Sequence, residues 1–414
     1  MTPSPPRRRD EILRTAAALI ADEGYRAASM RDVATASGIL AGSLYHHFPS
    51  KEAIAVELVE EYHADLVRTV RDFGPIAGDP VAALRSFARD AAEVSGRHRA
   101  AVQISKFDAP SIASSSLKTV VRALPASLDR QWRMLISAAV LAGAIDPRLD
   151  TRILRHVLRS TTLQAGIIVW ERGAPDGGVR AAADCTTSIL FDGLAAGAAA
   201  LGEFTGKSAA IRAVNEARAR WAAEAARRRT ERRAALLDDA RSQFALRGFE
   251  VTTMRDIAEA AGLPAGNLYR YFQSKDAMVA EILGEFSDRL LDAYQEVLAT
   301  GGSAVESLDG ICWLLDQAGR HFSREIEMLK SHGKVLSLAV ARHYREGAEA
   351  RYGMLVSLIE AGVATGELKH LAEPALVASC VREIMWAPMR NLAPISPVRV
   401  REFCRRSVLA GAAA

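Results

Sequence analysis

The chain has 414 residues, of which 49% are hydrophobic and 25% are charged, and its formal net charge is +4. This composition excludes a disordered tail, and the length allows two to four domains with ordinary cores. So small a net charge points to an anionic partner only if the positive charge is locally concentrated. Apolar residues recur at helical spacing and alternating β-branched runs are rare, so we predict an all-α protein.

Signals for a membrane segment or a metal site are weak. The apolar stretch Ile189–Leu201 is too short to span a bilayer and contains Asp192. The four cysteines are scattered without a CxxC motif, which argues against a disulfide framework or a zinc site. No charged and then apolar leader opens the chain. We therefore expect a cytoplasmic protein with no metal, no cofactor and no membrane partner.

The beginning of the chain contains clear helix signals. Arginines 7–9 precede a predicted helix that ends near Gly24. Ser29 stands three residues before Asp32, a capping-box pattern that opens a second helix, and Gly38 ends that helix. Helix, short glycine turn and helix are typical of a helix-turn-helix module.

The next stretch, GSLYHHFPSK at residues 42–51, predicts a short third helix, with Ser50 as the N-cap of a fourth. Leu44 and Phe48 share one face and are expected in the core. The remaining hydroxyl, rings and ammonium are groups that contact DNA phosphates and base edges. Gly42 within the helix costs about 1 kcal/mol relative to alanine, which close approach to another surface would explain. Taken alone, Tyr45 also fits a half-buried ring at the protein surface, and a run of arginines also fits a solvated surface.

The same stretch occurs a second time, as GNLYRYFQSK at residues 266–275, which lies 224 positions later. Residues 29–53 and 253–277 align without a gap, with about 14 of 25 positions identical, so a module of domain size is duplicated. Each copy follows a run of arginines, and the second run comprises Arg227, Arg228, Arg229, Arg232 and Arg233. The recurrence of glycine, tyrosine and lysine behind basic runs favours nucleic-acid binding over an ordinary surface.

The duplicated module with this motif resembles the TetR family of bacterial transcriptional regulators. The resemblance is specific over about 50 residues of each half, and the remainder matches in length and helical character. Members of the family carry one module per chain and act as homodimers, so the duplication is a departure from the pattern. Tandem chains of this kind are similar to actinobacterial regulators of lipid-import (mammalian cell entry) operons.

The resemblance implies two tandem halves, each with a DNA-binding module and a helical effector and dimerisation domain. The implied parts are a first module at 1–54, a first effector domain at 55–205, a basic helical linker at 206–229, a second module at 230–277 and a second effector domain at 278–414. In the first effector domain we predict helices around Val81–Val94, Leu128–Leu141, Thr151–Trp170 and Ala181–Leu201. If the effector domains pack on each other, the chain is a pseudo-dimer, monomeric or further dimerised, with recognition helices about 34–36 Å apart.

The family's DNA contacts, carried over by position, give eight residues in each module. In the first module they are Arg31, Ala41, Gly42, Ser43, Tyr45, His46, His47 and Lys51. In the second module they are Arg255, Ala265, Gly266, Asn267, Tyr269, Arg270, Tyr271 and Lys275. The resemblance implies that the tyrosine and lysine of each set bind phosphates, and that Arg31, Ser43 and His46, or Arg255, Asn267 and Arg270, contact bases. Asparagine pairs well with adenine and arginine with guanine, so the differing sets predict an asymmetric operator.

The effector is less defined by the sequence. Apolar side chains that could line a pocket are Phe107, Trp132, Met134, Trp170, Trp313, Met328, Met354, Met385 and Trp386. Side chains of this kind also fill ordinary helical cores. The resemblance implies a small apolar ligand, lipid or acyl-CoA-like, that shifts a repressor towards a state unable to bind DNA.

Two other classes of protein, an enzyme and a helical adaptor, fit the sequence less well. An enzyme would use Ser43, His46 and His47, but these neighbours on one short helix lack a third group to orient a base. An all-helical adaptor for protein partners fits the composition but does not explain the recurrent motif. We therefore expect a non-enzymatic transcriptional regulator whose partners are double-stranded DNA and a small ligand.

Overall fold

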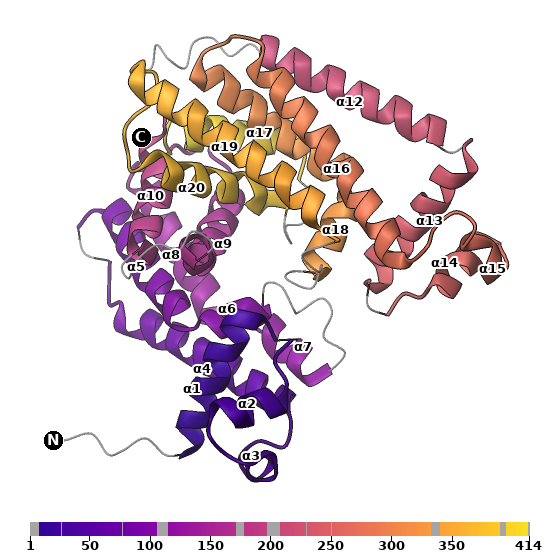
Figure 1. Ribbon diagram of the computed structural model, residues 1–414. Coiled ribbons are helices and arrows are strands. Elements are labelled where there is room, and N and C mark those ends of the chain that lie inside the picture. Colours follow the sequence, from indigo (N-terminus) through magenta and orange to yellow (C-terminus); the bar gives the residue numbers. More distant parts are fainter. Residues whose placement is uncertain are drawn as a thin grey trace.

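The structure, a computed structural model, describes residues 8–412 except 26, 77, 106–114, 171–177, 197–207, 229, 250, 333–339 and 390–394. Over this part the chain is built from helices, as predicted, and contains no strand beyond one isolated bridge. Figure 1 shows the first half, coloured indigo to magenta, packed against the second half, coloured pink through orange to yellow. None of the helices described combines the length and the apolar character needed to cross a bilayer.

The first half consists of helices α1 to α10. They are α1 (Arg8–Glu23), α2 (Met30–Ala36), α3 (Ala41–His47), α4 (Lys51–Asp72), α5 (Pro80–Arg97), α6 (Arg99–Gln103), α7 (Ser115–Arg122), α8 (Ala126–Leu141), α9 (Thr151–Trp170) and α10 (Gly178–Asp192). Three of the four helices predicted in the effector domain correspond to α5, α8 and α9. The fourth, expected to reach Leu201, is shorter, because Gly193 has a φ of +72° and leaves the helix.

The second half begins with the linker helix and repeats the module. Its elements are α12 (Ala209–Arg228), α13 (Arg232–Arg247), α14 (Met254–Ala260), α15 (Ala265–Leu268), α16 (Lys275–Leu298), α17 (Ala304–His321), α18 (Ser323–His332), α19 (Arg342–Ala364), α20 (Pro374–Trp386), the 3₁₀ turn η4 (Ala387–Met389), α21 (Pro397–Phe403) and the π-helical η5 (Cys404–Leu409). The repeat extends beyond the aligned sequence. Helix α17 begins and ends 224 residues after α5, so the duplication includes the start of the effector domain.

One apolar core runs through most of the molecule. It contains residues of the first module such as Ile12, of the first effector domain such as Trp132, and of the second effector domain such as Phe286. The second module has a separate core, to which Leu236 and Leu268 belong. The two effector domains therefore share one apolar core, and Leu329 and Tyr344 pack against both this core and that of the second module.

The two halves meet through their last helices, where α9 and α10 pack against α20, η4 and η5. The chain after α10 pairs with the turn after α19, since Lys369 N donates to Leu194 O at 2.8 Å. The end of the chain pairs in the corresponding way with the turn after α8, since Asp146 N donates to Ala412 O at 3.0 Å. Equivalent segments thus exchange equivalent contacts, as in a two-fold interface between identical subunits.

Two glycines allow the backbones to approach closely at this interface. A Cβ on Gly193 would lie 2.4 Å from the carbonyl carbon of Ala410, and a Cβ on Gly411 would lie 2.6 Å from that of Asp192. Both glycines also have positive φ, +72° and +94°, which favours glycine. The crossing point of the two halves therefore leaves no space for side chains.

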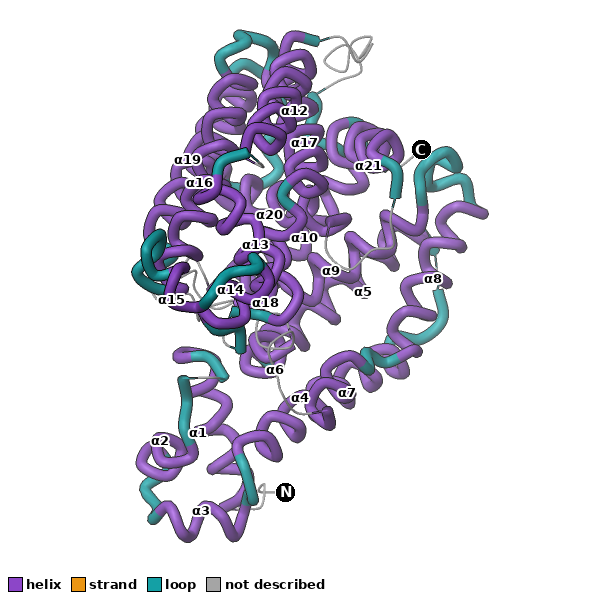
Figure 2. Tube along the Cα trace, turned by 90° about the vertical axis from the view of Figure 1, so that its right-hand side faces the viewer, coloured by secondary structure: helices purple, strands orange, loops and turns teal. Residues whose placement is uncertain are grey.

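The linker is a packed helix and not a loose tether. Figures 1 and 2 show α12 lying along α16 and α17. The Trp221 ring meets the Phe322 ring edge to face at 4.9 Å, and Trp313 Nε1 donates to Asn215 Oδ1 at 3.2 Å. The predicted linker at 206–229 thus contains a helix with a defined position on the second effector domain.

Candidate nucleic-acid interface

Short-range hydrogen bonds fix the first module. Ser29 N donates to Asp32 Oδ2 at 2.9 Å and Asp32 N donates to Ser29 Oγ at 3.2 Å, so the predicted capping box opens α2. These bonds to Ser29 lower the pKa of Asp32. Gly38 turns the chain towards α3 with a φ of +64°. Ser50 Oγ accepts from Ala53 N at 3.1 Å and caps α4. The predicted helix-turn-helix is therefore present.

Helix α3 separates core residues from outward-facing residues. Leu44 and Phe48 are buried, as predicted, whereas Ser43 and His46 are exposed. Tyr45 is 53% exposed, which leaves its ring and hydroxyl accessible. The other predicted contact residues, Arg31, Ala41 and Gly42, are exposed, and His47 and Lys51 are half-buried. Most of the predicted set thus reaches one accessible surface around α2 and α3.

The second module repeats this arrangement with a shorter recognition helix, α15. Thr253 N donates to Asp256 Oδ2 at 2.7 Å in the corresponding capping box. The bonds to Thr253, with Arg247, lower the pKa of Asp256 to about 2. The exposed contact candidates are Arg255, Gly266, Asn267, Tyr269, Arg270 and Tyr271, whereas Lys275 is half-buried. Ala265 begins α15, but its side chain lies outside the described part.

Among the residues that the structure describes, no contact requires glycine at Gly42 or Gly266. A Cβ at either position would meet no atom within 4 Å, and neither residue has a positive φ. Glycine within a helix costs about 1 kcal/mol relative to alanine, and the packing here offers no compensation. The close approach of an outside surface, expected at both glycines from the sequence, stays a prediction.

The two lysines of the motif are bound inside their own modules. Lys51 Nζ donates to the carbonyl oxygens of Tyr25 and Ala28, each at 2.8 Å, and lies 4.7 Å from the centre of the Tyr25 ring. Lys275 repeats this, with Nζ donating to Phe249 O at 2.9 Å. Each lysine thereby fixes the loop after the module's first helix to the start of α4 or α16. This position does not favour the phosphate contact expected of either lysine, which stays untested.

Both arginine runs are partly used within the protein. Arg9 pairs with Glu57 and its Cζ lies 4.4 Å from the centre of the Phe48 ring. Arg233 pairs with Glu281 in the same way, 224 residues later. Arg7 and Arg229 lie outside the described residues. These inner arginines brace the modules, so the runs are not simply basic arms.

One exposed apolar residue beside α3 was not predicted as a contact. Leu40, the N-cap residue of α3, is 80% exposed, and Pro264 is exposed at the same place before α15. Apolar side chains contact the methyl group of thymine in the major groove. The signal in the sequence is an apolar residue directly before each recognition helix that does not fit the core spacing.

The predicted pocket residues differ in burial and in the core to which they belong. Trp132 and Met385 are buried in the main core, and the half-buried set comprises Trp170, Trp313, Met354 and Trp386. Met134 is 52% exposed, which does not fit the wall of a pocket. Met328, on α18, packs in the apolar core of the second module. Phe107 lies outside the described residues.

Known proteins similar to this chain are bacterial regulators. The sequence model for the family "Bacterial regulatory proteins, tetR family" matches residues 12–58 and 236–282, which lie in the two modules. The transcriptional repressor KstR2 of Mycolicibacterium smegmatis is 33% identical over 172 residues, which cover 41% of this chain and 84% of the repressor. KstR2 of Rhodococcus jostii is 32% identical over 188 residues, covering 45% of this chain and 91% of that protein.

A solved structure and the extent of the matches complete the comparison. The structure of the ketosteroid transcriptional regulator KstR2 of Mycobacterium tuberculosis is 29% identical, with a TM-score of 0.39, and covers 44% of this chain and 91% of that one. Each of these relatives is thus matched by less than half of this chain, which carries the family's module twice. The relatives are transcriptional regulators and not enzymes. The chain belongs to the TetR family of helix-turn-helix regulators, in a tandem arrangement.

Proposed function

We propose that this chain is a cytoplasmic transcriptional repressor whose two non-identical modules bind the two halves of one asymmetric operator. A small apolar ligand, lipid or acyl-CoA-like, releases it from the DNA. The observation that carries the proposal is an exposed helix with glycine and tyrosine that recurs after 224 residues, in two halves packed on each other. The five parts are those expected from the sequence, with boundaries after residues 54, 205, 229 and 277.

The proposed contacts divide into two kinds. Tyr45 and Tyr269 place a hydroxyl at the exposed surface of each module and bind phosphates, which position the protein without selecting a sequence. Gly42 and Gly266 let the DNA backbone approach the helix. The selecting contacts come from the exposed set Arg31, Ser43 and His46, and from Arg255, Asn267 and Arg270.

Differences between the selecting sets support an asymmetric operator. Asn267 is suited to adenine and Arg270 to guanine, and each good bidentate pair discriminates by about 1–3 kcal/mol. The first module has Ser43 and His46 at these positions, and a serine hydroxyl is less selective. The second half-site should therefore tolerate fewer base changes than the first.

Intrachain contacts support a pseudo-dimer. Ordinary C₂ dimers use the same surface on both subunits, and here the corresponding exchange of backbone bonds joins Lys369 with Leu194 and Asp146 with Ala412. One chain would then present α3 and α15 to successive major grooves, about 34–36 Å apart. Further dimerisation is not needed for two half-sites.

The proposed ligand acts within the effector domains. We propose three tryptophans of the predicted set as pocket residues, namely the buried Trp132 and the half-buried Trp170 and Trp386. Trp132 Nε1 is buried without a hydrogen-bond partner in the described part of the chain. Buried indole N–H groups are usually hydrogen-bonded. The unbonded N–H of Trp132 therefore supports a pocket in the first half, in which a ligand oxygen accepts this hydrogen bond.

The first test measures mass and composition of the complex. DNA from upstream of the chain's own gene is mixed with purified protein, and the mass is measured by light scattering. One chain of 44.6 kDa per operator supports the pseudo-dimer. Two or more chains per operator would remove it, while a chain that binds no specific DNA would remove the function itself.

A second candidate is an adaptor that binds protein partners through helices. The exposed Tyr45 and Leu40 favour it, since apolar surface also marks protein interfaces. Salt separates the two functions, because log affinity for DNA falls by about 0.9 per log salt for each neutralised phosphate. Tyr45→Ala should weaken DNA binding, whereas Met134→Ala, exposed on α8, is the control and should not.

A further inference from the structure

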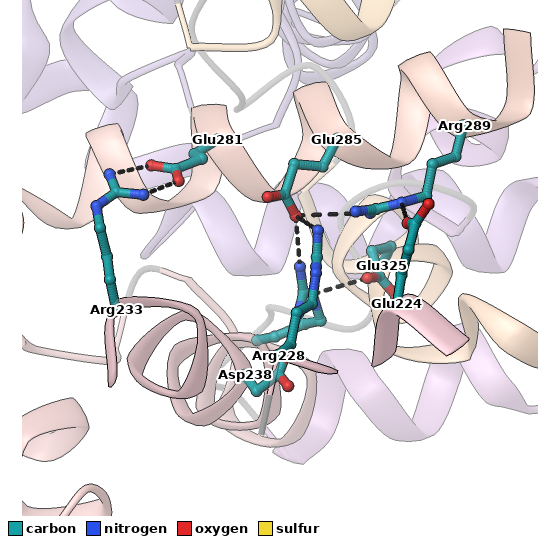
Figure 3. Close-up of polar contacts among 9 residues, drawn as sticks. Glu224, Arg228, Arg233, Asp238, Glu281, Glu285, Arg289 and Glu325 are labelled. Carbon is teal, nitrogen blue, oxygen red and sulfur yellow. Dashed lines mark hydrogen bonds and ion pairs between the residues drawn. The ribbon is translucent and has the colours of Figure 1, made fainter. Parts of the chain in front are cut away.

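Charged side chains join the second module to the rest of the chain. Figure 3 labels Glu224, Arg228, Asp238, Glu285, Arg289 and Glu325. Together with Arg241 these residues form the junction cluster. They come from the linker helix α12, from α13 at the start of the second module, and from α16 and α18. The cluster thus lies where the linker, the module and the second effector domain meet.

Arg241 of α13 is at the centre of the cluster and is only 5% exposed. Its Nε lies 2.7 Å from Glu325 Oε1 on α18, and its Nη2 donates to Glu285 Oε2 on α16 at 3.2 Å. It also pairs with Asp238 of its own helix. Burial raises the pKa of Glu325. A single, largely buried guanidinium therefore connects three helices.

Glu285 extends the cluster to the linker. Its Oε2 lies 2.8 Å from Arg228 Nη2 on α12 and 3.6 Å from Arg289 Nη1 on α16. Arg289 Nε in turn donates to Glu224 Oε2 of the linker at 2.8 Å. Removing one partner of a buried pair leaves the other charge uncompensated. The linker, α13 and α16 are therefore held in one mutual arrangement.

Apolar packing does not fill this junction. A cavity of about 290 Å³ lies beside the cluster, and its wall includes Arg241 and Glu325 together with Trp221 of the linker. The second module has its own apolar core, to which α18 contributes Met328. The charged pairs therefore add to the apolar contacts of Leu329 and Tyr344, which pack against both cores.

The first module lacks the central pair of this cluster, Arg241 and Glu325. The residues 224 positions before Arg241 and Glu325 are Ala17 and Ala101. Ala101 is 1% exposed and belongs to the main core, against which Ala17 packs. Two alanines in the α1–α6 contact thus take the places of the buried pair between α13 and α18, and the ion pair that joins α1 to α6 is the more exposed one of Asp22 and Arg99.

We infer that Arg241 is a positioning residue for DNA binding by the second module, which sets the orientation of α15 relative to the linker and the second effector domain. Arg241 acts at a distance, because Leu236 of α13 and Leu268 of α15 share one buried core and so move together. The inference rests on the proposed function, since it requires α15 to enter DNA. The two modules then differ in how they are held as well as in which bases they contact.

The test uses the full chain and an operator selected from random DNA by the wild-type protein. Two further probes each keep one half-site and replace the other with random sequence. The variant R241A/E325A gives the second half the alanine pair of the first half, Ala17 and Ala101, and leaves no unpaired charge between these two positions. The variant R220A is the control, because it removes a pair between the linker and α16, that of Arg220 with Glu296, and keeps every residue of the junction cluster.

We expect R241A/E325A to lose about 2- to 30-fold in affinity on the probe that keeps the second half-site. On the probe that keeps the first half-site it should bind as wild type does, as should R220A on both. R241K, which keeps the charge, should recover part of the loss. Hydrogen exchange of α13–α15 checks that the module stays folded.

Other outcomes remove the inference in distinguishable ways. Equal losses on both probes would indicate general destabilisation, and no loss on either would mean that Arg241 does not position α15. A third outcome is that the second module unfolds in R241A/E325A and that R241K binds DNA no better than this double variant. Arg241 would then be a purely structural residue. If wild-type protein selects no operator with two half-sites, the proposed function itself fails.

Discussion

The close approach of Gly193 to the C-terminal segment allows a quantitative test of how the halves are joined. In Gly193→Ala, the new Cβ would lie 2.4 Å from the carbonyl carbon of Ala410 and 2.5 Å from Leu409 O. These are backbone atoms, which cannot rotate away. Alanine would also have to adopt a φ of +72°. The variant therefore combines backbone strain with overpacking between the halves.

The two effects can be separated by a matched glycine. Gly143 has a φ of +69° in the turn after α8, but a Cβ there would meet no atom within 4 Å. Gly143→Ala should cost about 1–2 kcal/mol, the penalty of the left-handed conformation alone. Overpacking adds about 1–3 kcal/mol, so Gly193→Ala should cost about 2–5 kcal/mol. The difference between the variants measures the contact between the halves.

Urea unfolding followed by tryptophan fluorescence provides the assay. Stability falls linearly with urea, so the shift in midpoint at an unchanged slope gives the loss. Gly193→Ala should shift the midpoint further than Gly143→Ala, and Gly411→Ala should resemble Gly193→Ala. Equal shifts for Gly193→Ala and Gly143→Ala would refute the close approach of the two halves at this point.

Three further predictions concern the modules and the interface. Lys51→Met should lower the stability of the first module and leave the salt dependence of DNA binding unchanged, because Nζ is bound to backbone carbonyls; a slope smaller by about 0.9 would instead establish a phosphate contact. Asn267→Ala should weaken binding only to operators with the preferred base at its position, measured by titration against all four bases, and a uniform loss would contradict base contact. Bonds to Arg148, with Arg406, lower the pKa of Asp146 to about 2, so its stabilisation is present above about pH 3.8 and is lost as the pH falls towards 2. The difference in stability between wild type and Asp146→Asn should therefore disappear near pH 2, and a difference that persists there would contradict this assignment.

Local features of the modules could be predicted from the sequence because the interactions that form them are short. The capping boxes at Ser29 and Thr253 join residues three apart, and the buried Leu44 and Phe48 follow helical spacing. The second module could be predicted because its sequence aligns with that of the first. Helix α10 was predicted too long, because the apolar composition continues past Gly193 although the backbone does not.

Long-range interactions could not be predicted in the same way. The bond from Lys51 to Tyr25 spans 26 residues, and its direction depends on how α4 crosses α1. The pair of Arg241 and Glu325 brings together helices far apart in the chain. Met134 was expected in a pocket because of its apolar type, yet the orientation of α8 exposes it. Residue type alone does not determine which face of a helix is covered.

Joining both halves in one chain makes their association independent of dilution. Two separate subunits dissociate when their concentration falls below the dissociation constant. Here the partner surface of α9 and α10 is tethered through α12, and short tethers give effective concentrations of about millimolar. A cell with only a few copies of this chain would still contain assembled regulator. Because both halves belong to one chain, they cannot exchange between molecules. A defective half therefore cannot form mixed assemblies with intact halves.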